Sequence, residues 1–353
     1  MPNRSDHEGQ LFGPRGRRPP TTLRTIDQQS SPGQHASGEA GATSRRIAVL
    51  APIAWRTPPR HYGPWELFAS LLADGLVALG HDVTLFATGD SITTAALRSC
   101  VERGWSEDDT VDVKVAECLH ISQAFEAAGD FEIIHNGFDF LPLTYSALVS
   151  TPLVTTIHGF SSERILPVYA KYDATSTYVA ISDANRHPDL TYAATIHHGI
   201  DVDAFCTDVE PGDGLLFFGR IHPDKGTAEA VQLALRCDRS LTIAGIIQDA
   251  RYFSEQVEPH LDERVRFVGA VNALQRPATL ARAHALVHLI DFEEPFGYSV
   301  AEALVCGTPV IAYDRGSMSE LIIDGVTGFL VEDLAGAVEA VSKVQQLDRN
   351  EIR

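Results

Sequence analysis

Short apolar runs alternate with longer amphipathic stretches along most of this sequence. Six runs in the first half have the length and β-branched content of buried strands, and six more follow in the second half. The predicted strands are 47–51, 83–87, 132–135, 153–158, 178–182 and 194–198, then 215–218, 241–244, 265–268, 285–290, 309–313 and 328–331. Such alternation of strands and helices is typical of parallel sheets covered by helices on both faces.

The stretch between the first two predicted strands shows the helical pattern most clearly. Pro64 favours a helix start, because its missing N–H is not needed in the first turn, and Gly80 favours an end. We expect one buried face on this helix, made of Leu67, Phe68, Leu71, Leu72, Leu76 and Leu79. Further helices are predicted over 298–306 and 333–346.

A polar stretch at 207–213 separates the two sets of strands. We therefore predict an α/β protein with two doubly wound, Rossmann-like domains, over 45–206 and 207–353. Their facing strand ends should form a cleft where ligands bind. Residues 1–44 contain five prolines and six glycines and almost no apolar periodicity, which predicts a disordered tail.

Composition restricts the ligands and the compartment. The formal net charge is −19, and only Lys114, Lys171, Lys225 and Lys343 supply lysine. A chain this acidic is a poor binder of nucleic acid or anionic membranes, so an anionic ligand needs a local positive pocket. No apolar run reaches the ~18 residues of a membrane span. No secretory signal is visible in the first 44 residues, and we predict a cytoplasmic protein without stable membrane insertion.

The five cysteines show no metal-ligand or redox spacing. They are Cys100, Cys118, Cys206, Cys237 and Cys306, and no two form a C-x-x-C pair. We expect buried, small apolar residues in a reducing compartment.

A dehydrogenase is disfavoured. No G-x-G-x-x-G follows any predicted strand, so a dinucleotide pyrophosphate has no close approach to the backbone.

The segment 293–302 is the strongest local signal. It places an acidic loop between a strand end and a helix that begins near Tyr298, with Gly307 as its C-cap. The amides of residues 297–299 would be free donors at a helix N-terminus, a natural site for an anion or a sugar hydroxyl. Glu294 and Glu302 can accept hydrogen bonds from vicinal hydroxyls. Alternatively, both carboxylates only favour the helix N-terminus electrostatically or are solvated.

A second signal follows the strand predicted at 215–218. Arg220 and Lys225 lie five residues apart on the loop before the next helix. Two cations beside a helix N-terminus can neutralise a diphosphate without a metal.

Together these segments resemble the retaining, nucleotide-sugar-dependent glycosyltransferases of family 4, which have the GT-B fold. The resemblance begins with Gly219-Arg220, Lys225-Gly226, Glu294-Pro295-Phe296-Gly297 and Glu302. It extends in order over segments 61–66, 80–87, 156–159, 180–182, 198–201, 243–245, 267–269 and 324–329, and covers about residues 46 to 342.

The resemblance implies a role for each matching residue. Arg220 and Lys225 would clamp the diphosphate of the donor, for example a UDP-sugar, and stabilise the departing nucleoside diphosphate. Glu302 would hold the ribose hydroxyls. Glu294 would hold the transferred sugar together with the amides of Phe296, Gly297, Tyr298 and Ser299. His158 would face the donor sugar across the cleft, and Gly63 would let the first-domain loop approach the diphosphate.

No metal or other cofactor is expected. The leaving phosphate is commonly proposed in this family to take the acceptor's proton, so a Ser/His/Asp triad is not required. The D-x-D motif at Asp201 and Asp203 follows His198-Gly199-Ile200 near the predicted domain junction, and we interpret it as structural. A covalent intermediate is disfavoured, because no carboxylate matches on the opposite face.

The sequence departs from the family pattern at several positions. Pro64 replaces a second glycine and removes an N–H, His135-Asn136-Gly137 replaces H-x-H, and Tyr298 replaces a leucine. Family members normally continue into a helix that crosses back onto the first domain, whereas this sequence ends at Arg353. The alternatives are a catalytically degenerate nucleotide-sugar-binding protein, or a hydrolase or epimerase on the same fold. The sequence leaves the donor base, the sugar and the acceptor open.

Overall fold

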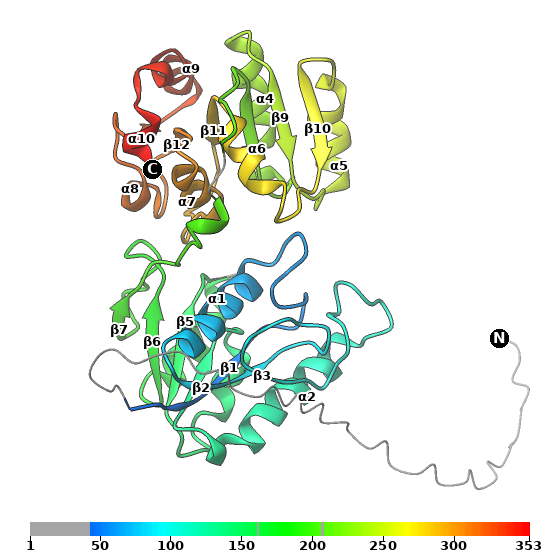
Figure 1. Ribbon diagram of the computed structural model, residues 1–353, viewed down its shortest axis with the longest axis vertical. Helices are drawn as coiled ribbons and strands as arrows, with labels where there is room; N and C mark the ends of the chain where they lie inside the picture. The colour runs from blue at the N-terminus through cyan, green and yellow to red at the C-terminus, as the bar shows by residue number, and fades with distance from the viewer. Residues whose placement is uncertain (1–42, 161, 206–207) are drawn as a thin grey trace, which may run out of the picture.

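The computed structural model describes residues 43–160, 162–205 and 208–353, and the tail predicted for 1–44 lies outside this part except for its last two residues. Two parallel-sheet lobes stand one above the other, with the first half of the chain in one and the second half in the other (Figure 1). This arrangement confirms the predicted α/β class and the two doubly wound sheets.

The N-terminal domain is built on a parallel sheet with the order β3-β2-β1-β4-β5-β6-β7 among the described residues. Its strands are β1 (Arg46–Leu50), β2 (Asp82–Phe86), β3 (Ala96–Arg98), β4 (Ile133–Asn136), β5 (Leu153–Ile157), β6 (Ser176–Ala180) and β7 (Tyr192–Thr195). Its helices are α1 (Pro64–Ala78), α2 (Val113–Glu126) and α3 (Leu166–Tyr172).

Alternation along β1 sends side chains to two separate cores. Ile47 and Val49 pack with Ala69 and Ala73 of α1, whereas Leu50 packs on the opposite face in the core that includes α2. Both faces of the sheet are therefore covered, as a parallel sheet requires.

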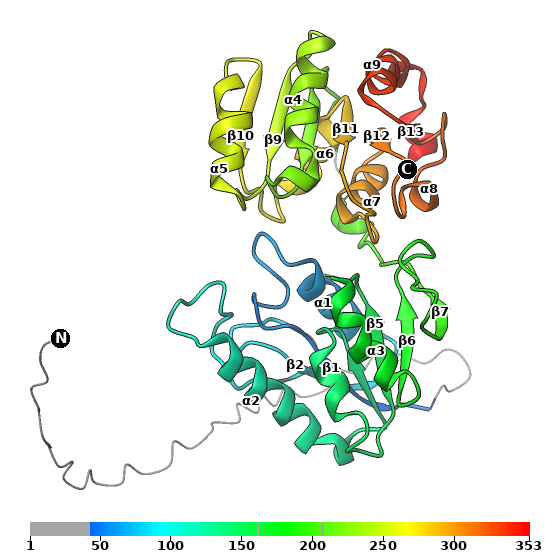
Figure 2. The same ribbon diagram turned by 180° about the vertical axis from the view of Figure 1, so that it is seen from behind.

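The C-terminal domain repeats the plan with the order β10-β9-β8-β11-β12-β13, again within the described part of the chain. Its strands are β8 (Leu215–Phe218), β9 (Leu241–Ala244), β10 (Val265–Gly269), β11 (Ala285–His288), β12 (Val310–Tyr313) and β13 (Gly328–Val331). Its helices are α4 (Thr227–Arg236), α5 (Ala250–Tyr252), α6 (Arg276–Arg282), α7 (Tyr298–Val305), α8 (Met318–Leu321), α9 (Leu334–Lys343) and α10 (Arg349–Ile352). Seen from behind, α7 lies at the edge of this lobe that faces the first one (Figure 2).

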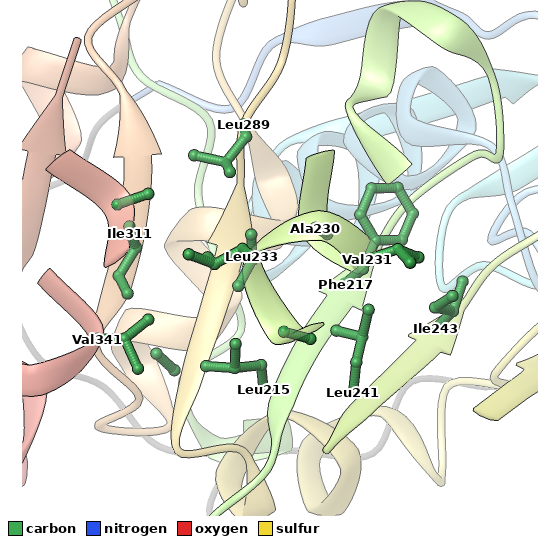
Figure 3. Close-up of a cluster of buried hydrophobic side chains, with 14 of the residues drawn as sticks. Leu215, Phe217, Ala230, Val231, Leu233, Leu241, Ile243, Leu289, Ile311 and Val341 are labelled. Carbon is green, nitrogen blue, oxygen red and sulfur yellow. The ribbon is translucent and has the colours of Figure 1, made fainter. Parts of the chain in front are cut away.

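The larger core of this domain lies between the sheet and α4 and α9. Leu215 and Phe217 of β8 meet Val231 and Leu233 of α4, with Val341 of α9 at the side (Figure 3). Full burial of each large apolar side chain contributes about 1.5–3 kcal/mol relative to exposure. This packing fixes the strand ends from which the candidate site residues project.

The segment that connects the two sheets already packs on the C-terminal domain near its start. Phe205 is buried in the second core of the C-terminal domain, and Ile200 packs against it. These residues precede the boundary that the sequence analysis expected between 206 and 207.

Most predicted strands are present with shifts of one or two residues at their ends, but two other expectations are wrong and a third holds only in part. The three-residue edge strand β3 was missed, since its few residues carry no alternation. The expected face of α1 holds only in part: Leu72 and Leu76 pack against the core, but Ala69 and Ala73 are the apolar residues buried completely. Leu79 is 73% exposed because the helix has ended before it. The described cysteines are not buried: Cys118 is exposed, and Cys100, Cys237 and Cys306 are half-buried. Cys206 lies outside the described residues.

Candidate active site

A cleft of about 740 Å³ separates the two domains. Its walls are formed where strands of both sheets end, with Pro52 after β1, His158 after β5, Arg220 after β8 and the loop after β11. The carboxyl ends of parallel strands are where open α/β sheets bind ligands. The predicted cleft is therefore present, and its chemistry depends on the side chains that line it.

The C-terminal wall carries an ion pair that is mostly buried. Lys225 closes a short 3-10 turn before α4, and its Nζ lies 2.8 Å from Oε2 of Glu294. The side chains are 15% and 12% exposed. The ammonium group also lies 4.3 Å from the ring centroid of Phe292, a cation–π contact. Arg220 lies on the same loop and donates from Nη1 to the side-chain oxygen of Gln248.

Glu294 is held in its ionised form. Burial alone would raise its pKa, but the His288 ring and the Lys225 charge outweigh burial and lower the pKa to about 2. His288 Nε2 lies 3.6 Å from Oε2 of Glu294. At neutral pH this carboxylate is a hydrogen-bond acceptor facing the cleft.

A second buried pair lies one turn along α7. Glu302 is 2% exposed, and Oε1 accepts from Nη1 of Arg276 at 2.9 Å. Burial raises the pKa of Glu302, and the Arg276 charge acts in the opposite direction. Arg276 also donates from Nη2 to the carbonyl oxygen of His61 at 3.3 Å, so it touches both domains.

The N-terminus of α7 opens toward the same space. The first helical bonds run from the amides of Val300 and Ala301 to the carbonyl of Gly297. The amides of Tyr298 and Ser299, both cleft residues, therefore stand at the open end of the helix. A helix N-terminus of this kind favours negative charge.

Four stacked rings cross from one domain to the other. Trp65 stacks on His158 at 5.3 Å between centroids, His158 on His198 at 5.2 Å, and His198 on Tyr298 at 4.8 Å. Burial lowers the pKa of His158 well below its usual value and that of His198 to about 3, so both rings are neutral at pH 7. The Tyr298 hydroxyl and His198 Nδ1 are among the buried polar atoms of the described residues that have no hydrogen-bond partner.

Glu320 of α8 joins the domains beside the cleft. Its Oε2 accepts from the amide of Asp183 at 3.0 Å and lies 2.8 Å from His197 Nε2, and its Oε1 accepts from the amide of Ala184 at 2.8 Å. One carboxylate thus holds the turn after β6 and the segment after β7 against the C-terminal domain.

Comparison with known proteins assigns the chain to a family. The profile of the family described as glycosyl transferases group 1 matches residues 210–351. The chain is 34% identical over 357 residues to glycogen synthase of Mycobacterium tuberculosis strain ATCC 25618 / H37Rv. This alignment covers 83% of this chain and 84% of that protein. The chain belongs to the group 1 glycosyl transferases.

Other similarities of this glycosyltransferase agree with that placement. It is 27% identical over 285 residues to a D-inositol 3-phosphate glycosyltransferase of Kribbella flavida, covering 63% of this chain and 65% of that protein. The structure of Anabaena Alr3699/HepE in complex with UDP and glucose aligns with a TM-score of 0.62 at 19% identity, covering 87% of this chain and 97% of that chain. The two facing domains have the GT-B fold, and the enzyme is a sugar transferase of EC class 2.4.

The glycosyltransferase brings the residues that the sequence analysis proposed for the site into one cleft. The lining includes Gly63, His158, Arg220, Lys225, Glu294, Phe296, Gly297, Tyr298, Ser299 and Glu302. Their individual roles stay predictions.

Two of these residues make contacts that their sequence motifs did not suggest. Lys225 was expected as a phosphate clamp, and it also contacts Glu294. Gly63 has φ +146°, and a Cβ there would lie 2.7 Å from Oε2 of Glu66. The glycine is thus required by the protein's own packing as well as by any approach to a ligand.

Arg276, His288 and Trp65 are cleft residues that the sequence reasoning missed. His288 ends β11, so the rule that strand ends face the cleft could have found it. Arg276 begins α6 and Trp65 lies in the first turn of α1, where no single-sequence signal separates them from surface or core residues.

Within residues 43–160, 162–205 and 208–353, no group of three or more His, Cys, Asp or Glu side chains is arranged to hold a metal ion. Across the same ranges, no helix is long and apolar enough to cross a membrane.

Proposed function

We propose that this glycosyltransferase moves a sugar from a nucleoside-diphosphate sugar to an acceptor, with retention of anomeric configuration and without a metal ion. One observation carries the proposal: two mostly buried carboxylates, each paired with a cation of the same domain, line one cleft. A nucleotide sugar presents a diphosphate between two sets of vicinal hydroxyls, so its binding site needs cations and hydrogen-bond acceptors side by side.

The cations suit the diphosphate. Arg220 and Lys225 share the loop after β8, and the open N-terminus of α7 lies on the same wall. As the bond between the anomeric carbon and the phosphate oxygen breaks, these groups would stabilise the charge that develops on the leaving nucleoside diphosphate. Removing one such preorganised donor costs about 3 kcal/mol in a typical transition state.

The carboxylates suit the hydroxyls on either side. Glu294, ionised because its pKa is about 2, would accept from hydroxyls of the transferred sugar. Glu302 would accept from the ribose hydroxyls, oriented by Arg276. His158 is neutral, and its ring, which lines the cleft, would contact the donor sugar.

Retention follows if the acceptor attacks on the face from which the phosphate leaves. In that step the anomeric carbon exchanges its bond to the phosphate oxygen for a bond to the acceptor oxygen. The proton of the acceptor hydroxyl passes to the departing phosphate. This scheme needs no protein base in the cleft.

Nucleotide titration by calorimetry tests the donor site. UDP is the first candidate, because the Anabaena protein of the same fold was solved with UDP and glucose. We expect one of UDP, GDP and ADP to bind and, at 100 times Kd, to stabilise the protein by about 2.7 kcal/mol. Arg220→Met should weaken binding at least tenfold, whereas the matched control Arg266→Met, an exposed arginine of β10 outside the cleft, should not. Absence of binding by all three nucleotides would contradict the proposal.

Turnover and stereochemistry are tested separately. Nuclear magnetic resonance of the product should show the anomeric configuration of the donor, and inversion would refute retention. Activity should persist in EDTA, and a loss that Mg²⁺ restores would refute the metal-free mechanism.

A nucleotide-sugar-binding protein without turnover is the second candidate. Pro64 occupies the first position of α1 directly after Gly63, so one N–H that could contact a phosphate is missing. Binding of a nucleotide without release of nucleoside diphosphate from any sugar donor and acceptor extract would favour this reading. Release that needs no acceptor would indicate a hydrolase.

A further inference from the structure

The N-terminal wall of the cleft is rich in aromatic surface. The sequence contains three tryptophans, and all three, Trp55, Trp65 and Trp105, line this wall. Trp65 has one face occupied, because it stacks on His158. Trp55 and Trp105 are half-buried, so part of each indole remains accessible.

Trp55 and Trp105 come from two loops that are bonded side by side. The amide of Trp105 donates to the carbonyl of Ile53 at 3.2 Å, and the amide of Ser106 donates to the carbonyl of Ala54 at 3.0 Å. Gly104 allows this close approach, since a Cβ there would overlap the Ala54 carbonyl. The two indoles are thus held on fixed backbone, which limits the entropy lost when a ligand packs on them.

Carboxyl groups lie among these aromatic rings. Glu66, Glu117 and Asp139 line the same wall. Oε1 of Glu66 accepts from the amide of Trp55 at 3.2 Å, and Oδ1 of Asp139 accepts from the Tyr169 hydroxyl at 3.0 Å. Burial raises the pKa of all three groups, that of Glu66 to about 7. These groups are fixed partners for hydroxyls.

Positive charge is confined to the other wall. Among the described residues of the cleft, every lysine and arginine belongs to the C-terminal domain, namely Arg220, Lys225 and Arg276. The nearby Arg60 does not line the cleft and is occupied by Asp90 at 2.9 Å and Glu107 at 2.6 Å. An anionic acceptor on the N-terminal wall would therefore meet carboxyl groups and no cation.

We propose that the acceptor is an uncharged carbohydrate, whose ring packs on Trp55 and Trp105 and whose hydroxyls bond to Glu66, Glu117 and Asp139. Sugar rings present apolar C–H faces edged by hydroxyls, which is the pattern this wall complements. The inference rests on the proposed function, because it takes the opposite wall as the donor site.

Intrinsic fluorescence tests the proposal, since all the tryptophans line the cleft. The probes are three neutral oligosaccharides, maltohexaose, cellohexaose and mannohexaose, and two anions, myo-inositol 3-phosphate and glucose 6-phosphate, each titrated in saturating UDP. We expect a saturable change with at least one neutral oligosaccharide and weaker binding of both anions. Tighter binding of either anion, or no response to any neutral oligosaccharide while UDP binds, overturns the inference.

Variants assign the contact. Trp105→Ala should weaken oligosaccharide binding about tenfold, equivalent to 1.4 kcal/mol, whereas Trp105→Phe should lose less because a ring remains. Leu148→Ala, an exposed apolar residue of the same domain outside the cleft, should leave the affinity unchanged. UDP titration of each variant checks its fold. Equal affinities for Trp105→Ala and the Leu148 control would refute the contact, and failure of UDP to bind the wild type would refute the proposed function instead.

Discussion

Replacing Lys225 by methionine separates the structural role of the buried ion pair from its chemical role. Methionine keeps much of the apolar volume of the lysine stem but removes the charge 2.8 Å from Glu294. Because both side chains are mostly buried, the remaining carboxylate would keep only the His288 ring, 3.6 Å away, as a partner. Breaking a buried pair in this way costs about 3–5 kcal/mol.

The pKa of Glu294 gives the magnitude for all of its contacts together, because the His288 ring and Lys225 both lower the pKa against the effect of burial. Its fall from 4.5 to about 2 on folding corresponds to about 3 kcal/mol of stability at neutral pH. The folded-state pKa is the lower one, so this stability is present above about pH 4.5 and is lost as the pH falls toward 2. The stability gap between the wild type and Lys225→Met should therefore narrow on acidification.

Thermal unfolding at pH 7.5 is the assay. A loss of 3–5 kcal/mol lowers the Tm of a domain of this size by roughly 10 °C. The double variant Lys225→Met/Glu294→Gln should recover most of the loss yet stay inactive. Lys343→Met is the matched control, because Lys343 pairs with Glu339 at 3.5 Å and is 52% exposed, and it should change the stability by less than about 1 kcal/mol. If the single and double variants are equally stable, or if Lys225→Met matches the control, the reasoning is wrong.

Two further variants test the buried carboxyl group of Glu66 and the contact of Glu320 between the domains. Burial raises the pKa of Glu66 from 4.5 to about 7, so the folded protein loses stability as the pH rises between these values. The Tm of Glu66→Gln minus that of the wild type should therefore increase from pH 5 to pH 8. A difference in Tm that does not change with pH would contradict this. Glu320→Ala removes a carboxylate that bonds to the other domain, so small-angle X-ray scattering should show a larger radius of gyration than for the wild type. An unchanged profile would refute its role in holding the domains together.

The sequence predicted the fold and the C-terminal half of the site because both depend on local patterns. Apolar runs located the strands, and motifs at the ends of β8 and β11 placed Lys225 and Glu294 at one sheet edge. That these two residues contact each other is a consequence of side-chain packing across 69 positions, which no local pattern encodes.

The N-terminal half of the site was less predictable for the same reason. Trp55 and Trp105 lie on irregular loops 50 residues apart, joined by backbone hydrogen bonds that have no periodicity in the sequence. The buried face of α1 was assigned to its leucines. Leu72 and Leu76 do pack on that core, but the apolar residues packed against it with complete burial are Ala69 and Ala73. Which residues of α1 pack against β1 depends on the size of their side chains, and a pattern of hydrophobic positions does not contain that information.

A crystal structure of the protein with its preferred nucleoside diphosphate would show directly where the donor binds. We expect the diphosphate within hydrogen-bond distance of Arg220 and Lys225, and the ribose hydroxyls on Glu302. A nucleotide bound on the N-terminal wall, or outside the cleft, would contradict this expectation.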